Sequence, residues 1–283
     1  MLGTTTCVGG QHTDTSTPIH ITYCDNPDTT AAGVNAEIAT MHAKGGAFQI
    51  NHPGDRKWYG RYQNQLLQMV PDSIEVWNIG AWEFQPPAPA ANDNDFSLTF
   101  WEMFLNAGYH VAATGGSDSH WRSTSPLQGI GQPTTWVYSP GRTWRDITDG
   151  IRSGYTMVSH QPPAYAGQRV FLEADADGNG TFESMPGDTI PAGAAMRVRT
   201  QYAVPGAYVR IVSGDGTSKD VTLGADGTSE TFTTGGGWAR AELVLPDAQA
   251  QRQSACDPVV GSQTTYCRNR ELVLSLSSAI YQV

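Results

Sequence analysis

Three side chains that commonly bind divalent cations follow short apolar runs of this sequence. Asp118 and His120 form an Asp-x-His pair in a glycine-rich loop, and His52 lies in an Asn-His-Pro-Gly segment. The pair offers one hard oxygen and one imidazole nitrogen from a short extended segment, and Pro53 restricts the backbone that orients His52. Each motif alone is more typical of an ordinary turn. Their combination at the ends of successive predicted strands indicates a metal site.

The first half of the sequence alternates predicted helices and strands. Apolar spacing and terminal glycines predict helices over 29–44, 95–106 and 143–153, and strands over 47–50, 73–78 and 110–114. This alternation implies right-handed crossovers and a mostly parallel sheet or barrel. Loops at the C-terminal ends of such strands converge on one mouth. We therefore expect His52 and the Asp-x-His pair to meet there.

The second half has a different pattern. Short apolar stretches separated by Gly and Asp-Gly turn signals predict strands over 170–174, 196–202, 208–212, 229–233, 239–245 and 271–276. All seven histidines precede residue 161, and Gln161-Pro162-Pro163 would break a helix. The composition shift predicts two domains, a metal-binding segment over residues 1–162 and a small antiparallel β-sandwich over residues 163–283.

The order of the motifs resembles the PHP (polymerase and histidinol phosphatase) superfamily. Asn-His-Pro-Gly at 51–54 is followed by Ile-Glu-Val-Trp-Asn at 74–78 and by Thr-Gly-Gly-Ser-Asp-Ser-His-Trp at 114–121. The branch that it most resembles is the CehA/McbA-type metallohydrolases, which also have a segment similar to Gly-Asp-Thr-Ile at 187–190 before a β-rich tail. The resemblance implies an α/β protein with a distorted (β/α)7 barrel that holds two or three divalent ions, Zn, Mn or Fe.

The matching motifs imply which residues hold these ions. His52, Asp118 and His120 take ligand positions by the resemblance. A further ligand is expected on an earlier strand, and His20 in Pro18–Tyr23 fits this position better than His12. Glu75 is not a ligand by this likeness, and we interpret it as a strand residue near the mouth of the barrel.

The chain departs from the family at its start. Members open with a His-x-His strand end, further histidines and a glutamate ligand, and nothing before His12 supplies them. We expect that the sequence begins inside the barrel, because a chain that enters there leaves a sheet edge unpaired. The alternative is a degenerate member whose metal centre is incomplete.

A complete centre implies a metal-dependent hydrolase. Asp118 and His120 would help to generate a metal-activated hydroxide that attacks an ester-type bond, namely a phosphoester, a carboxylester or a carbamate. His12 would protonate the leaving group, and Arg56 or Arg61 would pair with an anionic small-molecule substrate. An apolar substrate pocket would be lined by Trp58, Trp82 and Trp121. The alternative function is a non-catalytic, exported ligand-binding protein with a degenerate metal site.

Charge and cysteine content limit the partners and the compartment. A net charge of −10 disfavours nucleic acid, and neither a basic cluster nor a run of roughly 20 apolar residues indicates a membrane partner. Cys7 with Cys24 and Cys256 with Cys267 form two local pairs that suit disulfides, although four separate buried thiols are an alternative. Disulfides would place the protein outside the cytosol, secreted or periplasmic, with a signal peptide upstream of Met1. The sequence indicates no oligomeric state.

One acidic segment in the second half suits calcium. Its oxygens alternate around two glycines, although the twelfth position is Pro186 rather than the glutamate of an EF-hand. A turn without an ion explains the segment equally well, and we favour that interpretation. The calcium candidates are Asp175, Asp177, Asn179 and Glu183.

The histidines outside these motifs are interpreted as structural. His160 lies at the predicted domain boundary, and His110 opens a strand. His42 lies on a helix, and we expect it to face solvent.

Overall fold

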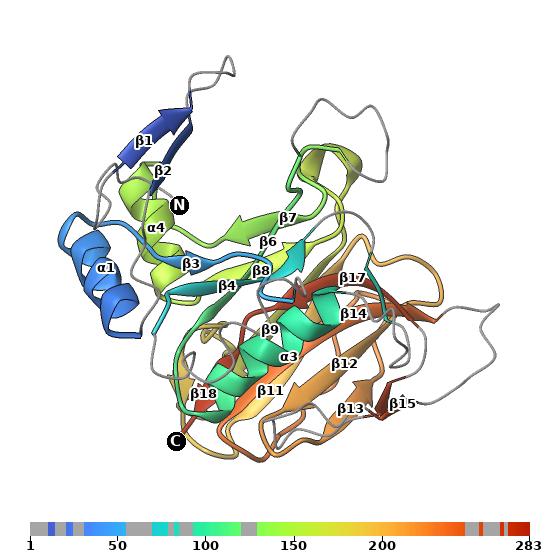
Figure 1. Cartoon of the computed structure of the whole chain (residues 1–283). Helices are drawn as coiled ribbons and strands as arrows, with labels where there is room; N and C mark the ends of the chain where they lie inside the picture. Colours follow the sequence, from blue (N-terminus) through green and yellow to red (C-terminus); the bar gives the residue numbers. More distant parts are fainter. Residues whose placement is uncertain are drawn as a thin grey trace.

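The computed structural model describes residues 11–14, 21–24, 31–54, 70–78, 82–84, 93–119, 129–246, 255–256, 267–268 and 271–283. Within these residues the chain is a mixed α/β protein that is rich in strands and has few helices (Figure 1). None of the helices described there is long and apolar enough to cross a membrane.

The predicted helices are confirmed, and their ends follow local chemistry. The helix α4 (Trp144–Arg152) begins with a capping box, in which Thr143 and Asp146 each accept a hydrogen bond from the other's backbone N–H. The helix α1 (Ala31–Ala43) is followed by Gly45, and α3 (Asp93–Asn106) is followed by Gly108, both with the positive φ that favours glycine. A short 3-10 turn, η2 (Pro163–Tyr165), follows the region of the predicted boundary.

Three parallel strands form a small sheet in the order β3-β4-β6. They are β3 (Gln49–Ile50), β4 (Ser73–Asn78) and β6 (Ala112–Gly116). All of β4 except its last residue is buried, as expected for a parallel strand that is covered on both faces. Residues of α3, including Leu98, Trp101 and Phe104, share a core cluster with Ile74 and Val76 of β4.

A nine-stranded sheet occupies most of the remaining chain. It runs in the order β10-β18-β14-β17-β8-β7, with β12 and β5 paired to β14 and β17, and β13 paired to β12. Its strands are β5 (Trp82–Phe84), β7 (Thr134–Val137), β8 (Thr156–Ser159), β10 (Thr189–Ile190), β12 (Tyr208–Ser213), β13 (Ser218–Val221), β14 (Trp238–Pro246), β17 (Glu271–Ser277) and β18 (Ile280–Gln282). Strands from both sides of residue 162 therefore share one sheet, and the proposed division at that residue stays a prediction.

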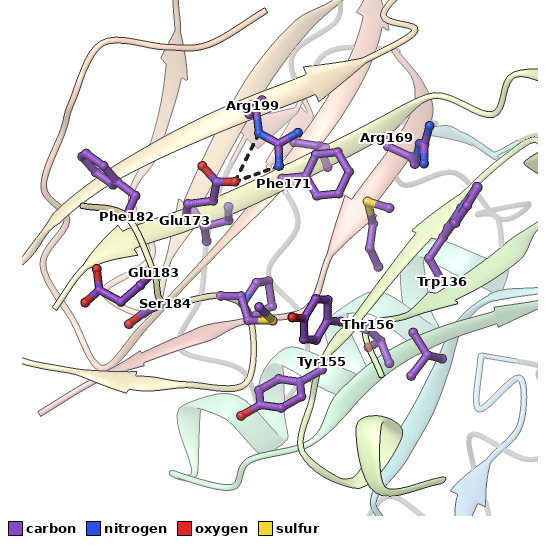
Figure 2. A pocket seen from close by; sticks show the side chains of 17 residues that line it. Trp136, Tyr155, Thr156, Arg169, Phe171, Glu173, Phe182, Glu183, Ser184 and Arg199 are labelled. Atoms are coloured by element: carbon purple, nitrogen blue, oxygen red, sulfur yellow. Dashed lines mark hydrogen bonds and ion pairs between the residues drawn. The ribbon is translucent and has the colours of Figure 1, made fainter. Parts of the chain in front are cut away.

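Strands β9 (Arg169–Asp175) and β11 (Ala195–Gln201) form an antiparallel pair that is a separate two-stranded sheet. Alternate residues such as Leu172 and Val198 share a second core cluster with Ile211 of the large sheet. The opposite face of this pair carries Phe171 beside charged groups, and Figure 2 shows Arg199 paired there with Glu173.

The predicted strand over 229–233 is wrong. In the structure this segment makes only isolated bridges, among them Arg199 with Thr228 and Met196 with Phe232. The two bridges are three residues apart on β11 but four apart on the segment, so an extra residue interrupts the ladder.

Two short antiparallel pairs contain cysteines. The pair β1 (Gln11–Asp14) with β2 (Ile21–Cys24) sets Gln11 opposite Cys24. The pair β15 (Ala255–Cys256) with β16 (Cys267–Arg268) sets Cys256 opposite Cys267. Directly opposed positions of an antiparallel pair are at a separation that suits a disulfide. The expected link between Cys256 and Cys267 is compatible with this register, whereas Cys7 lies outside the described residues.

Candidate metal centre

His52 and Asp118 occupy equivalent positions, because each follows the C-terminal end of an outer strand of the parallel sheet. His52 comes two residues after β3 ends at Ile50, and Asp118 comes two residues after β6 ends at Gly116. The central strand β4 lies between these two strands. Both residues have left-handed backbones, with φ of 31° and 44°, a conformation that is uncommon for residues other than glycine and is concentrated at functional sites.

Glu75 of β4 connects the two strand ends. The backbone N–H of His52 donates to its Oε2 at 2.9 Å, and Asn78 Nδ2 donates to the same oxygen at 3.2 Å. Glu75 is buried, and this burial is the main reason why its pKa is raised. The two hydrogen bonds and the charge of His52 oppose the rise, and the charge of Asp118 adds to it. His52 and Asp118 therefore both lie close enough to act electrostatically on one buried carboxylate.

Glycine at the end of β6 leaves room for this carboxylate. A Cβ at position 116 would lie 2.6 Å from Glu75 Oε1. Such a contact is too close for a real side chain, so any larger residue would displace Glu75. Packing therefore requires glycine at position 116.

The imidazole of His52 has a buried nitrogen with an unsatisfied lone pair or proton. Its Nδ1 atom is buried and has no hydrogen-bond partner among the described residues. A buried polar atom without a partner is destabilising, and it therefore calls for an explanation such as a catalytic role or a bound ion. Neutral imidazole nitrogen is a common ligand for Zn, Mn and Fe, so this atom fits the predicted chemistry.

The loop that carries His52 is anchored on both sides. The backbone N–H of Gly54 donates to Ser97 Oγ on α3 at 2.9 Å. Gln49 donates to Asn51 at 2.8 Å, and its own Oε1 accepts hydrogen bonds from the hydroxyls of Ser73 and Thr114. These contacts fix the loop before any ion binds.

The other predicted site residues are not placed by the structure. His20, Arg56, Trp58, His120 and Trp121, together with Arg61, lie outside the described residues. The backbones of His12 in β1 and Trp82 in β5 are described, with His12 opposite Tyr23 and Trp82 opposite Val273, but their side chains are not. Of the predicted ligands, the structure places His52 after β3 and Asp118 after β6, on either side of β4, and the metal-binding role of all four stays a prediction.

Glu75 is the residue that sequence reasoning undervalued. It was expected near the mouth of the barrel, but its contact with the His52 loop was not. A usable signal was present, because Glu75 is the one acidic residue of β4, between Ile74 and Val76, which are fully buried. A charged residue in a strand that is covered on both faces needs a specific partner.

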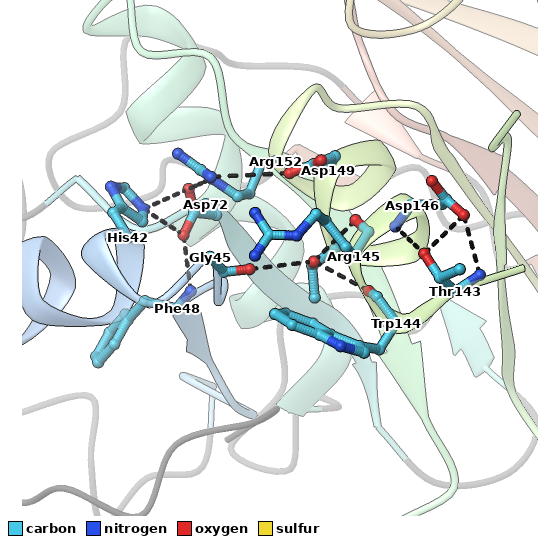
Figure 3. Close-up of polar contacts among 11 residues, drawn as sticks. His42, Gly45, Phe48, Asp72, Thr143, Trp144, Arg145, Asp146, Asp149 and Arg152 are labelled. Atoms are coloured by element: carbon cyan, nitrogen blue, oxygen red, sulfur yellow. Dashed lines mark hydrogen bonds and ion pairs between the residues drawn. The ribbon is translucent and has the colours of Figure 1, made fainter. Parts of the chain in front are cut away.

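The prediction that His42 faces solvent is wrong. Its Nε2 lies 2.8 Å from a carboxylate oxygen of Asp72, which also accepts the backbone N–H of Phe48 at 2.7 Å (Figure 3). Arg152 of α4 approaches the same carboxylate at 3.5 Å. A buried carboxylate just before β4 therefore ties α1 and α4 to the parallel sheet, which explains why His42 turns inward.

The two remaining histidines pack on aromatic rings. His160 stacks on Trp77 with ring centroids 5.9 Å apart, and His110 stacks on Tyr281 at 3.5 Å. Burial lowers the pKa of both imidazoles. These contacts suit a packing role, although Nε2 of His160 is also buried without a hydrogen-bond partner among the described residues.

The acidic calcium candidate is a closed turn. Carboxylate oxygens of Asp175, Asp177 and Glu183 lie within 4.8 Å of one another. Asp175 accepts the backbone N–H groups of Asn179 and Gly180 at 3.0 and 2.8 Å, and Asn179 Oδ1 accepts the N–H of Thr181. Much of the oxygen capacity that a calcium ion would use is therefore taken by the turn itself.

Comparisons of the chain with protein-family models, with curated proteins and with solved structures return no match. The case for a metal centre therefore depends on the arrangement of His52, Glu75 and Asp118.

Proposed function

We propose that this chain is a metal-dependent hydrolase of the PHP type that cleaves an ester-type bond, a phosphoester, carboxylester or carbamate, in a small-molecule substrate. The observation that supports this most strongly is that His52 and Asp118 follow the C-terminal ends of β3 and β6, while Glu75 of the strand between them accepts the backbone N–H of His52. Active sites of parallel α/β folds form at this edge. The three parallel strands would then be part of a distorted (β/α)7 barrel.

Strand β8 packs against the parallel sheet. Thr156 Oγ1 donates to the carbonyl of Ala113 at 2.8 Å, and a Cβ at position 115 would meet Val158 at 2.6 Å. Because β8 pairs with β7 and β17 along its two edges, these side-chain contacts place one face of β8 against β6. The larger sheet therefore covers β6 and does not extend the series β3-β4-β6.

The ions would be held by His52, Asp118, His120 and His20. The unpartnered Nδ1 of His52 and the carboxylate of Asp118 fit two or three ions of Zn, Mn or Fe, because these metals bind imidazole and carboxylate ligands. The chemistry that such ions supply when bound is a lower pKa for water and polarisation of the oxygen at the scissile bond.

The protein's own residues would hold and complete this centre. Glu75 would act as a positioning residue, since its buried carboxylate fixes the backbone of His52. His12 would give a proton to the leaving group, and Arg56 would pair with an anionic substrate. The pocket for the apolar part of the substrate would be formed by Trp58, Trp82 and Trp121.

We further propose that the protein works in a secreted or periplasmic compartment. The register that sets Cys256 opposite Cys267 supports a disulfide, and disulfides persist in oxidising compartments. A non-catalytic, exported ligand-binding protein is the second candidate function. The cavity described in the next subsection is the observation that favours it.

Metal content and turnover test the proposal together. Purified protein is loaded with Zn, Mn or Fe, analysed by mass spectrometry for bound metal, and assayed with p-nitrophenyl phosphate, p-nitrophenyl acetate and a p-nitrophenyl carbamate. We expect more than one ion per chain and hydrolysis of at least one substrate that a chelator abolishes. The variants His52→Ala and Asp118→Ala should lose bound metal and turnover.

His42→Ala is the matched control for His52→Ala. It removes an imidazole that contacts the Asp72 carboxylate at the junction of α1 and α4, away from the strand ends. It should retain metal and turnover. Wild-type protein that binds no metal and hydrolyses none of the esters would leave only the ligand-binding alternative.

A further inference from the structure

A cavity of about 390 Å³ lies between the β7–β8 pair and the outer face of the β9–β11 pair. Its walls include Trp136, Tyr155, Met157, Arg169 and Phe171, and the segment 182–186 borders it (Figure 2). The volume is typical of sites for small molecules. None of the residues that line it belongs to the candidate metal centre.

The cavity lies on the side of β7 that faces away from the parallel sheet. Thr135 exchanges hydrogen bonds with the backbone of Gly115, at 2.8 and 2.7 Å, and therefore points toward β6. Its neighbour Trp136 points the opposite way, since successive side chains of a strand alternate. Trp136 is held in place by its indole N–H, which donates to Ser159 Oγ at 2.7 Å. The cavity is thus separate from the proposed catalytic site.

The same alternation explains the lining from β9. Val170 and Leu172 are fully buried in the sandwich core, so Arg169, Phe171 and Glu173 face the cavity. An outward face of a sandwich is ordinarily polar and solvated. Here it carries Phe171 opposite Trp136 and Met157, so the two elements form an apolar space rather than a hydrated surface.

Two charged side chains of the lining, Arg169 and the exposed Glu183, make no ion pair among the described residues. Glu173 pairs with Arg197 at 2.8 Å and with Arg199 at 2.9 Å, so these groups satisfy one another. Arg169 pairs with no carboxylate among the residues that the structure describes, and its Nε is buried without a hydrogen-bond partner. The cavity therefore contains one guanidinium that is available to a ligand.

Aromatic rings hold this guanidinium in place. Its central carbon lies 4.6 Å from the ring centroid of Trp136 and 5.3 Å from that of Tyr202. Tyr202 has a left-handed backbone, with φ of 57°. Stacking on the rings orients the planar group and leaves its edge for hydrogen bonds, which reduces the entropy that a ligand must overcome.

Hydrogen bonds also hold the segment that borders the cavity in place without a ligand. Asp188 accepts the backbone N–H of Met185 at 2.9 Å and the hydroxyl of Tyr155 at 3.1 Å. This aspartate belongs to the Gly-Asp-Thr-Ile segment at 187–190. The segment thereby ties two parts of the lining together.

We propose that this cavity binds a small organic anion. An aromatic or aliphatic body lies between Trp136, Met157 and Phe171, and a single carboxylate forms a bidentate pair with the edge of Arg169. A guanidinium fork matches a carboxylate, and the apolar walls strengthen the pair by excluding water. The site is independent of the metal centre, so it remains whether or not the chain is a hydrolase.

Two naphthalene derivatives of the same size test the proposal on the full chain. Binding of 1-naphthoate and of the neutral 1-naphthalenemethanol is measured by isothermal titration calorimetry, after treatment with a chelator and again after metal loading. We expect 1-naphthoate to bind about tenfold or more tightly than the alcohol, because a hydrogen bond to a charged group is lost in the neutral ligand. Metal should not change either affinity.

Three variants separate the cavity from unspecific binding. Arg169→Gln should remove the preference for the acid, and Ser184→Phe, which fills the cavity from a lining position, should abolish binding of both ligands. Arg142→Gln removes an exposed arginine that does not line the cavity and should change nothing. Circular dichroism shows which variants are folded. Wild-type protein that binds neither ligand, or a folded Arg169→Gln protein that keeps the preference, would overturn the proposal.

Discussion

Buried polar groups behave differently at two places in this molecule. Where α3 meets the large sheet, the charges are paired: Arg240 hydrogen bonds with Glu102 of α3 and with Glu242 of its own strand, and all three are fully buried. At the ends of the parallel strands, His52 has a buried nitrogen without a partner among the described residues and a left-handed backbone. Paired buried charges specify how elements join, whereas unsatisfied and strained groups mark places where structure serves binding or catalysis.

The largest effect is expected from breaking the paired network. Arg240→Met removes the guanidinium that Glu102 and Glu242 share and leaves two buried carboxylates without it. We expect the free energy of unfolding in urea to fall by about 3–5 kcal/mol. Because Glu102 lies on α3 and Glu242 on β14, loss of the network should destabilise the contact between α3 and the large sheet.

Arg197→Met is the matched control for this variant. It breaks a pair with Glu173 in which the arginine is 35% exposed, and we expect a loss of about 0–1 kcal/mol. Equal losses in the two variants would show that burial does not distinguish these ion pairs.

Substitution of Glu75 should have a smaller effect, on metal affinity rather than on stability. Glu75→Ala removes the acceptor for the backbone N–H of His52 and should weaken metal affinity about 10–100-fold, as loss of an outer-shell partner does. Glu75→Gln keeps an oxygen acceptor and should restore part of the affinity. Affinity is measured by competition with a chromophoric chelator. Unchanged affinity in Glu75→Ala would remove Glu75 from the account.

Two adjacent glycines, Gly115 and Gly116, distinguish an effect on stability from an effect on metal affinity. In Gly115→Ala the new Cβ meets Val158 at 2.6 Å and the backbone carbonyl of Trp77 at 3.0 Å, so stability should fall by about 1–3 kcal/mol with little change in metal affinity. In Gly116→Ala the Cβ meets Glu75 Oε1, so metal affinity should fall instead. Thermal melting measures the stability of both variants, and chelator competition measures their metal affinity. Loss of metal affinity in Gly115→Ala with loss of stability in Gly116→Ala would contradict the account.

The smallest effect concerns calcium. The turn that contains Asp175 and Asp177 is closed by its own backbone hydrogen bonds, so millimolar calcium should leave the melting temperature almost unchanged. Scanning calorimetry with calcium and with a calcium chelator measures this. A clear rise that Asp177→Ala abolishes would instead assign a calcium site to the sandwich.

The local sequence pattern was sufficient to predict many of the helices and strands. It was not sufficient to predict how the strands pair with one another. The strand over 73–78 and the three helices were predicted because their apolar spacing and glycine boundaries are local features. Strands β7 and β8 were missed, and the pairing of β8 with β17 joins segments far apart in the chain. Such pairing depends on tertiary contacts, which no short window of sequence contains.

The same limit applies to the candidate site. Residue types and strand ends were enough to select His52 and Asp118, because ligand chemistry depends on residue type. The role of Glu75 depends on a side chain of one strand reaching the backbone of His52 in a neighbouring loop, where the φ of His52 is left-handed. These features follow from geometry and have no local sequence pattern.

The most direct test is a crystal of the metal-loaded protein examined by anomalous diffraction at the absorption edge of the bound metal. We predict anomalous peaks at the C-terminal ends of β3, β4 and β6, with one peak at a ligand distance of roughly 2.0–2.2 Å from His52 Nδ1 or an oxygen of Asp118. A loaded protein whose peaks all lie elsewhere, with His52 and Asp118 free of metal, would contradict the proposed centre.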